Sequence, residues 1–380
     1  MSKSISISLC MIVKNEEETL ERCLESVKDI IDEYIIVDTG SDDKTKDIAK
    51  KYNSKIYDFK WTNNFGEARN FAFSKATKEY IMWLDGDDYF TAENIEKLKS
   101  LKEHLDRSVD SVTMNYSLTR DAKGNTVFSL RRNRLVKRKK NFKWIGRIHE
   151  YLEVSGNIIN EDISVFHGKV KPHNDRNLQI FRSMLANDEE FTPRDTYYFA
   201  NELYYNGFYK ESIEQYEKFI DSKLGWIEDV KSATSNLVEC YIQVGETEKR
   251  AKAILKTFEL DIPRADLCCK LGQYFIEKNL YKQAIFWYKT ALGCVHDEEC
   301  LGMDNKDYYT WIPAIQLCVC YCAIADFEAA YYYNELTALY VPNSEKVEHN
   351  RRYLRGKFKE LNQKLPKLSF DLKDRRHMHL

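Results

Sequence analysis

The sequence predicts an α/β domain with a mostly parallel sheet, followed by an all-α array of helical repeats. Two observations lead to this fold class. From Ile5 to about Tyr116, short β-branched runs alternate with helical ones, which is typical of parallel strands covered by helices. From about Asp175 onward, strand signals vanish and a helical segment repeats along the chain. We expect two domains and a tail, at residues 1–174, 175–365 and 366–380.

Five strands are predicted in the first domain, at Ile5–Val13, Tyr34–Val37, Lys55–Phe59, Tyr80–Leu84 and Ser111–Tyr116. An amphipathic helix separates the first two, because Leu20, Leu24 and Val27 recur at helical spacing behind an acidic first turn. A hairpin is expected around Asp121–Asn125. Ligands bind beyond the carboxyl ends of the strands in open parallel sheets, so we expect the site in the loops that follow strands.

The repeats appear as a constant offset of 72 residues, at which NELYYNGFYKESIEQYEK aligns with QYFIEKNLYKQAIFWYKT and Tyr209 falls on Tyr281. Half of this offset is close to the ~34-residue period of tetratricopeptide helix pairs. An intermediate copy is visible at Asn236–Leu255 and a fourth at Cys318–Leu336. Such pairs stack into a solenoid with a concave groove. A plain helical bundle is the alternative.

Composition and charge exclude several classes of protein. With 43% apolar and 31% charged residues, the chain is typical of folded globular proteins, and its net charge of −2 favours neither nucleic acid nor membrane as a partner. The longest apolar stretch, Trp311 to Ala325, is shorter than the ~20 residues of a spanning helix. The N-terminus lacks the features of a signal peptide. We therefore expect a cytoplasmic protein with no membrane span and no nucleic-acid partner.

The strongest chemical signal is WLDGDDYF, at Trp83–Phe90. Here an apolar strand ends and delivers Asp85, Asp87 and Asp88 within four positions. Carboxylates this close repel one another unless a cation offsets their charge, and hard divalent cations take oxygen ligands while also holding substrate phosphates. Taken alone, an acidic turn that caps the following helix explains the pattern about as well.

Two further loops favour the binding site over simple capping. In IIVDTGSDDKT, Asp38 follows a strand directly and precedes a glycine-containing turn and a helix start. A carboxylate at this point can accept hydrogen bonds from a base or a ribose. In CMIVKNEEETL, a strand likewise turns into a helix at Asn15–Glu16. Strand-to-helix capping accounts for either loop alone. The dinucleotide-binding pattern GxGxxG is absent, which argues against an oxidoreductase.

The series MIVKNEE, VDTGSDDKT, NNFGEARNFA and LDGDD strongly resembles the family 2 glycosyltransferases, which have the GT-A fold. Order and spacing match over roughly the first 110 residues. The resemblance implies a metal-dependent enzyme with a nucleotide-sugar donor. It implies that Asp38 contacts the base with Glu16 nearby, and that Arg69 reaches nucleotide or phosphate. It also implies that Asp85 and Asp87 face the ribose and a Mg or Mn ion that bridges the diphosphate.

A basic segment follows, RRNRLVKRKKNFKWIGRIHEYLE, whose cations can steady a diphosphate or an anionic acceptor, or form a solvated hairpin face. WIGRIHE and VFHGKVKP resemble parts of the subgroup that carries tetratricopeptide repeats and includes glycocin-type peptide S-glycosyltransferases. The resemblance to GT-A enzymes, in which a His late in the catalytic domain commonly completes the metal shell, implies that His167 is a metal ligand. A lone His at a strand end is otherwise usually structural. Glu150 is the best candidate for the general base and His149 is its competitor. Because side chains alternate along a strand, only one of the two should face the sugar.

The resulting hypothesis is inverting transfer of a hexose from a UDP-sugar to a Cys or Ser side chain of a peptide or protein, such as a bacteriocin precursor. The repeats would bind the acceptor, since solenoid grooves commonly bind extended or helical segments. One alternative is a transferase that acts on a cell-envelope saccharide. An alternative of another class is a repeat scaffold whose catalytic domain has decayed. The identity of the sugar, the linked atom and assembly as a homodimer stay open.

Overall fold

The computed structural model describes residues 4–120, 126–168, 175–296, 304–368 and 370. The chain divides into two compact units, residues 1–190 with 299–304, and residues 191–298 with 305–380. The predicted end of the first domain, Asn174, lies outside the described residues, as do most of the predicted tail and the hairpin expected at Asp121–Asn125. Helix α5 (Arg176–Ala186) belongs to the first unit.

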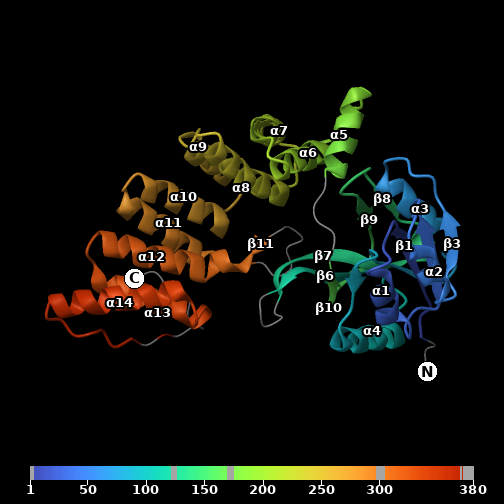
Figure 1. The fold of residues 1–380 in the computed structure, drawn as a ribbon, viewed down its shortest axis with the longest axis horizontal. Coiled ribbons are helices and arrows are strands. Elements are labelled where there is room, and N and C mark those ends of the chain that lie inside the picture. The colour runs from blue at the N-terminus through green and yellow to red at the C-terminus, as the bar shows by residue number, and fades with distance from the viewer. Residues whose placement is uncertain (1–3, 121–125, 169–174, 297–303, 369, 371–380) are drawn as a thin grey trace. The chain divides into compact units, whose positions relative to one another are not determined.

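The first unit is built on a mixed but mostly parallel sheet (Figure 1). Its parallel half has the order β3 (Lys55–Asp58), β2 (Glu33–Asp38), β1 (Ile7–Val13) and β4 (Tyr80–Trp83). The sheet continues through β7 (Thr126–Lys137), β6 (Ser111–Arg120), β10 (Ile158–His167) and β5 (Asp88–Tyr89). In this second half β7 is antiparallel to both neighbours, β10 is parallel to β6, and β5 is antiparallel to β10. All five predicted strands are present, with small differences at their ends.

Helices cover both faces of the parallel half, which explains its almost continuous apolar strands. The covering helices are α1 (Leu20–Val27), α2 (Thr45–Lys50), α3 (Phe65–Lys75) and α4 (Ala92–His104). Side chains alternate along β1, so Leu9 packs with Leu24 of α1 in one cluster, while Cys10 packs with Ala72 of α3 in another. A small antiparallel pair, β8 (Lys143–Ile145) and β9 (Tyr151–Glu153), follows the 3-10 turn η1 (Arg138–Lys140).

The second unit is helical, and consecutive helices pack in series (Figure 1). The helices are α6 (Pro193–Tyr205), α7 (Tyr209–Ser222), α8 (Ile227–Gln243), α9 (Lys249–Phe258), α10 (Ala265–Glu277), α11 (Tyr281–Gly293), α12 (Trp311–Ala323), α13 (Phe327–Tyr340) and α14 (Glu345–Glu360). A short strand β11 (Asp304–Asn305) and a 3-10 turn η2 (Lys306–Tyr309) lie between α11 and α12. Within the described ranges, no helix is both long and apolar enough to cross a membrane.

The four predicted repeat copies correspond to the helix pairs α6–α7, α8–α9, α10–α11 and α12–α13. In each pair, one residue in the turn has a positive φ, at Gly207 (79°), Gly245 (80°), Asn279 (58°) and Ala325 (61°). This is the left-handed conformation that commonly ends a helix. The equivalent Tyr216 and Tyr288 are both buried, in accord with the 72-residue offset. The predicted fold class, a mostly parallel α/β domain followed by helical repeats, is confirmed.

Candidate active site

A tight acidic turn follows β4, at the carboxyl edge of the parallel strands. The backbone N–H of Asp88 donates to the carbonyl oxygen of Asp85 at 3.1 Å, and the N–H of Asp85 donates to Oδ2 of Asp88 at 3.0 Å. Gly86 lies between them, where an added Cβ would come 2.7 Å from Cγ of Glu16. A larger residue at Gly86 would therefore displace the Glu16 side chain from the turn.

Asp87, Asp88 and His167 bring possible ligand atoms to within 4.8 Å of one another. The antiparallel pairing of β5 with β10 places His167 opposite Asp88. Nδ1 of His167 lies 3.5 Å from Oδ1 of Asp87 and 3.7 Å from Oδ1 of Asp88, and it is hydrogen-bonded to the Tyr116 hydroxyl at 2.9 Å. Interactions with Asp87 and Asp88 raise the pKa of His167 to about 9, although burial lowers it.

Asp88 is fully buried and forms an ion pair with the equally buried Arg134, with Oδ2 and Nη1 3.0 Å apart. Its other oxygen, Oδ1, is buried without a hydrogen-bond partner. A buried acceptor without a partner is costly, and most such atoms in native structures are satisfied. Two carboxylates and one imidazole, with one oxygen still open, fit a hard divalent cation such as Mg or Mn.

The structure differs from the sequence expectation in the third member of this cluster. Asp85 was expected beside Asp87 and His167, whereas Asp88 occupies that place. Asp85 instead binds Arg69, with Oδ1 and Nη2 2.7 Å apart. Burial raises the pKa of Asp85, but Arg69 and Arg134 hold it below its usual value. LDGDD contains both Asp85 and Asp88, so the sequence offers either as the third ligand. The register of β5 against β10, which pairs His167 with Asp88, distinguishes the two.

Arg69, on α3, links two carboxylates from distant parts of the chain. Besides Asp85, it binds Glu150, with Nε and Oε1 2.6 Å apart. The guanidinium lies 4.9 Å from the ring centroid of Trp83 and 4.8 Å from that of Trp144. These cation–π contacts and two ion pairs hold the Arg69 side chain in one place. Its contact with nucleotide or phosphate stays a prediction.

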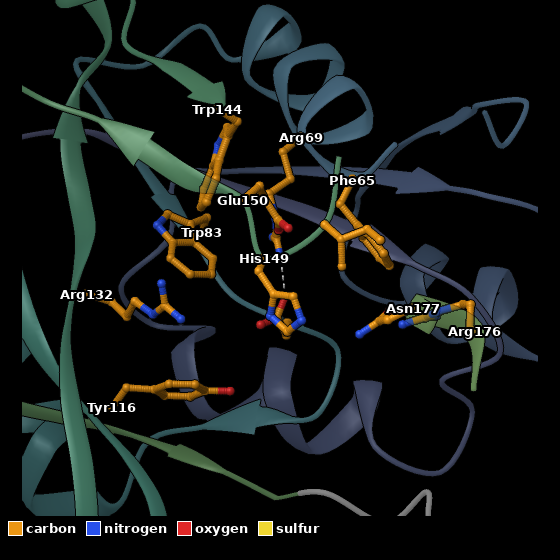
Figure 2. A pocket seen from close by; sticks show the side chains of 12 residues that line it. Phe65, Arg69, Trp83, Tyr116, Arg132, Trp144, His149, Glu150, Arg176 and Asn177 are labelled. Carbon is orange, nitrogen blue, oxygen red and sulfur yellow. Dashed lines mark hydrogen bonds and ion pairs between the residues drawn. The ribbon is translucent and has the colours of Figure 1, made fainter. Parts of the chain in front are cut away.

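Glu150 and His149 both line a cavity of about 290 Å³. Figure 2 shows them reaching into the space between Trp83 and Phe65. Only one of the pair was expected to face the sugar, on the ground that side chains alternate along a strand. The two residues lie in the turn between β8 and β9, where His149 has a φ of 50°, so the alternation of a strand does not apply.

Further lining residues were not singled out from the sequence. Arg132 of β7 and Arg176 and Asn177 of α5 reach the same cavity (Figure 2). The basic run that contains Arg132 indicated that cationic side chains could line the site. The two residues on α5 carried no comparable signal, because their proximity to Trp83 and Asp85 joins segments far apart in the sequence.

Asp38 ends β2 and is buried, with 1% of its surface exposed. Its Oδ1 accepts hydrogen bonds from the backbone N–H groups of Gly40 at 3.0 Å and Ser41 at 2.9 Å. Burial raises the pKa of Asp38, but these hydrogen bonds and those from the Ser41 side chain hold it below its usual value. Oδ2 is buried without a hydrogen-bond partner. A ligand N–H or O–H group could satisfy it.

The loops after β1 and β2 are bound to each other. The Asn15 N–H donates to the Ser41 hydroxyl at 2.9 Å, and the Asn15 side-chain oxygen accepts from the Asp42 N–H at 3.0 Å. The Glu16 N–H donates to the Thr45 hydroxyl at 2.7 Å. These bonds hold the two predicted nucleotide loops together. A second cavity, of about 310 Å³, is lined by residues that include Asn15, Glu16, Asp43 and Asp87.

Residues 8–153 match the model of glycosyl transferase family 2. They form a family 2 glycosyltransferase domain. The match contains Glu16, Asp38, Arg69 and the acidic turn, whereas His167 lies beyond it. The predicted fold class, a GT-A domain followed by tetratricopeptide-like helical repeats, is confirmed.

Two curated relatives match this chain, one named for its TPR repeats and the other named as a glycosyltransferase. A TPR repeat-containing protein of Synechococcus elongatus is 46% identical over 94 residues, which cover 25% of this chain and 23% of that protein. The glycosyltransferase SunS of Bacillus subtilis is 29% identical over 244 residues, covering 58% of this chain and 56% of SunS. The chain thus spans about a quarter to just over half of the length of these relatives.

Among solved structures, this chain is similar to residues 1–349 of TarS from S. aureus in complex with UDP, with 14% sequence identity and a TM-score of 0.37. The match covers 68% of this chain and 93% of the TarS chain.

Proposed function

We propose that this chain is a metal-dependent inverting glycosyltransferase that moves a hexose from a UDP-sugar to a Cys or Ser side chain of a peptide or protein. The observation that carries the proposal is the convergence of Asp87, Asp88 and His167 at the carboxyl edge of the sheet, with Oδ1 of Asp88 left open. Membership of the domain in family 2 supports the reaction class and the nucleotide-sugar donor.

Asp87, Asp88 and His167 would hold a Mg or Mn ion. When bound, such an ion neutralises the charge that develops on the diphosphate as the sugar leaves. By resemblance to family 2, Asp85 faces the ribose, and Arg69 keeps its carboxylate in place. Oδ2 of Asp38 offers a buried acceptor for an N–H or O–H group of the nucleoside. The linked loops at Asn15 and Ser41 need little rearrangement on binding, which favours affinity.

Glu150 is proposed as the base that takes the acceptor's proton. Its position on the cavity wall is held by Arg69, so the carboxylate is oriented before the acceptor arrives. His149 lines the same cavity and is the competing base. Inversion needs the base on the face of the sugar opposite the diphosphate, where a side chain from the β8–β9 turn would lie if the diphosphate sits on the Asp87 side.

The acceptor is proposed to be a peptide, such as a bacteriocin precursor, because arrays of helix pairs commonly bind extended or helical segments. We assign donor chemistry to residues 1–174 and acceptor binding to residues 175–365. Transfer to a cell-envelope saccharide is the enzyme alternative. A screen of peptide and saccharide acceptors with mixed UDP-sugars, read by mass spectrometry, distinguishes the two acceptor classes and identifies the sugar and the linked atom.

Hydrolysis of UDP-sugars tests the core of the proposal without an acceptor. We expect slow hydrolysis that needs Mn or Mg, stops in excess chelator and is lost in Asp87→Ala. Asp47→Ala is the matched control, because Asp47 is an exposed acid on α2 that forms an ion pair with Lys50. Undiminished hydrolysis in chelator would contradict the metal site. If no UDP-sugar is either bound or hydrolysed, the scaffold alternative is favoured.

A further inference from the structure

Arg22, on α1, contacts both chain segments that carry the candidate metal ligands. Its Nη2 donates to the carbonyl oxygen of Asp87 at 3.2 Å and to that of Gly168 at 3.0 Å. Gly168 directly follows His167, and its own N–H donates to the same Asp87 carbonyl at 2.9 Å. The segments that carry Asp87 and His167 are therefore joined by one backbone hydrogen bond and one shared guanidinium.

The guanidinium makes one further contact, and residues at the start of α1 and just before it contact the acidic turn. Cζ of Arg22 lies 4.5 Å from the ring centroid of Tyr89, which is adjacent to Asp88 in β5. The Cys23 thiol donates to the carbonyl oxygen of Asp85 at 3.6 Å, and Glu16 packs against Gly86. Residues in and just before α1 thus contact every residue from Asp85 to Asp87.

We infer that Arg22 is a positioning residue for the divalent-cation site, an inference that rests on the proposed function. Asp87 and His167 come from different segments, so the 3.5 Å between their ligand atoms depends on how those segments are joined. Arg22 touches the carbonyl groups of both segments and neither ligand side chain. Groups that orient metal ligands in this way typically change metal affinity 10- to 100-fold when removed.

The sign of the effect separates positioning from electrostatics. Arg22 carries a positive charge close to a site for a cation, so its loss through electrostatics alone would tighten cation binding. If Arg22 positions the ligands, its loss weakens binding instead. Because the side chain is exposed, we expect an effect near the lower end of that range, about 10-fold.

Gly168 provides a second variant that leaves the charge in place. An added Cβ would lie 2.0 Å from Nη2 of Arg22, so Gly168→Ala must displace the end of that flexible side chain. The φ of Gly168 is not in the left-handed region, so alanine strains no backbone there. Gly168→Ala should therefore reproduce the loss caused by Arg22→Ala, and the double variant should be no weaker than either single variant.

The experiment measures Mn²⁺ affinity of the full chain in the presence of UDP, by the electron paramagnetic resonance signal of free Mn²⁺. UDP affinity in chelator and the midpoint of thermal unfolding are measured alongside. Lys28→Ala is the matched control, since it removes a positive charge just after α1 that pairs with Glu25. We expect about 10-fold weaker Mn²⁺ binding in Arg22→Ala and Gly168→Ala, with Lys28→Ala and UDP affinity in chelator unchanged.

Unchanged or tighter Mn²⁺ binding in Arg22→Ala would overturn the inference while leaving the proposed function intact. Additive losses in the double variant would also overturn it, because Gly168 would then act independently of Arg22. If the unsubstituted protein binds no Mn²⁺, the metal site and this inference both fail. Should Arg22→Ala unfold, Mn²⁺ binding by Gly168→Ala decides the question, because that substitution deletes no contact other than that of Arg22.

Discussion

Strand β2 carries a buried carboxylate at each end, and the two differ in how many of their acceptor positions are filled. Glu33, at the amino end, accepts from the Ser8 hydroxyl at 2.5 Å and from the N–H and hydroxyl of Thr77 at 2.8 and 2.9 Å. It also pairs with Lys55 at 2.7 Å. Asp38, at the carboxyl end, is no more exposed, yet its Oδ2 has no hydrogen-bond partner.

Asp88, at the same edge of the sheet, resembles Asp38, because its Oδ1 is also buried without a hydrogen-bond partner. The difference between the two ends teaches which carboxylates serve folding and which are available to a ligand. A filled carboxylate stabilises the fold through its bonds, whereas an open buried oxygen lowers stability until something binds it. We therefore expect substitutions at the amino end to lower stability, and substitutions at the carboxyl end to lower ligand binding or catalysis.

Glu150 departs most from the rule that carboxylates with filled acceptor positions serve folding. It forms an ion pair with Arg69 and is nevertheless proposed as the base. Glu150→Gln should bind UDP-sugar normally and lower transfer by about 10²- to 10⁴-fold. The measurement is transfer rate and donor affinity near neutral pH, since a thiol acceptor ionises with a pKa of about 8.5 and needs a base less at high pH. If His149→Ala shows this behaviour and Glu150→Gln does not, the two roles are exchanged.

Asp87→Asn should lower metal-dependent hydrolysis by at least about 100-fold, since loss of a ligand should cost no less than loss of the groups that orient it. The stability of the metal-free protein should change little, because the substitution also relieves repulsion from Asp85 and Asp88. Hydrolysis and thermal unfolding are compared in the same preparations. A variant that unfolds in the absence of metal would place Asp87 with the fold-supporting carboxylates.

Glu33→Gln should do the reverse and destabilise the protein by about 3 kcal/mol at pH 7, with UDP affinity unchanged. Burial raises the pKa of Glu33, but hydrogen bonds from Lys55, Ser8 and Thr77 lower it to about 2. The stabilisation is present above the ordinary value of 4.5 and disappears as pH falls toward 2. Denaturant unfolding from pH 7 to pH 2 should show the two proteins converging. A gap independent of pH would contradict this origin.

Asp38→Asn should weaken UDP binding about 10-fold, because an amide at the open position replaces an acceptor by a donor or leaves the ligand's group unpaired. Its effect on the free energy of unfolding should be smaller than that of Glu33→Gln. Calorimetric titration with UDP measures the first quantity. Equal UDP affinity in Asp38→Asn and the unsubstituted protein would mean that the open oxygen at this end of β2 faces no ligand.

The repeats show how far local pattern reaches. Gly207 and Gly245 mark two of the turns in the sequence, and the 72-residue offset locates the third pair. Asn279 and Ala325 adopt the same left-handed conformation without glycine. For Ala325 no local preference predicts this, so packing of the flanking helices imposes it. The existence of each helix pair was predictable, whereas the left-handed conformation at Ala325 was not.

The sequence by itself determined the order of strands and helices, the loops that carry polar residues and the number of recognisable repeats, because periodicity and turn residues act over a few neighbouring positions. Only the tertiary structure decided that Asp88 joins Asp87 and His167 while Asp85 turns to Arg69. That choice depends on the register of β5 against β10, which brings Asp88 to His167, and on the packing of α3, which brings Arg69 to Asp85. Such contacts join residues far apart in sequence, where no local pattern encodes them.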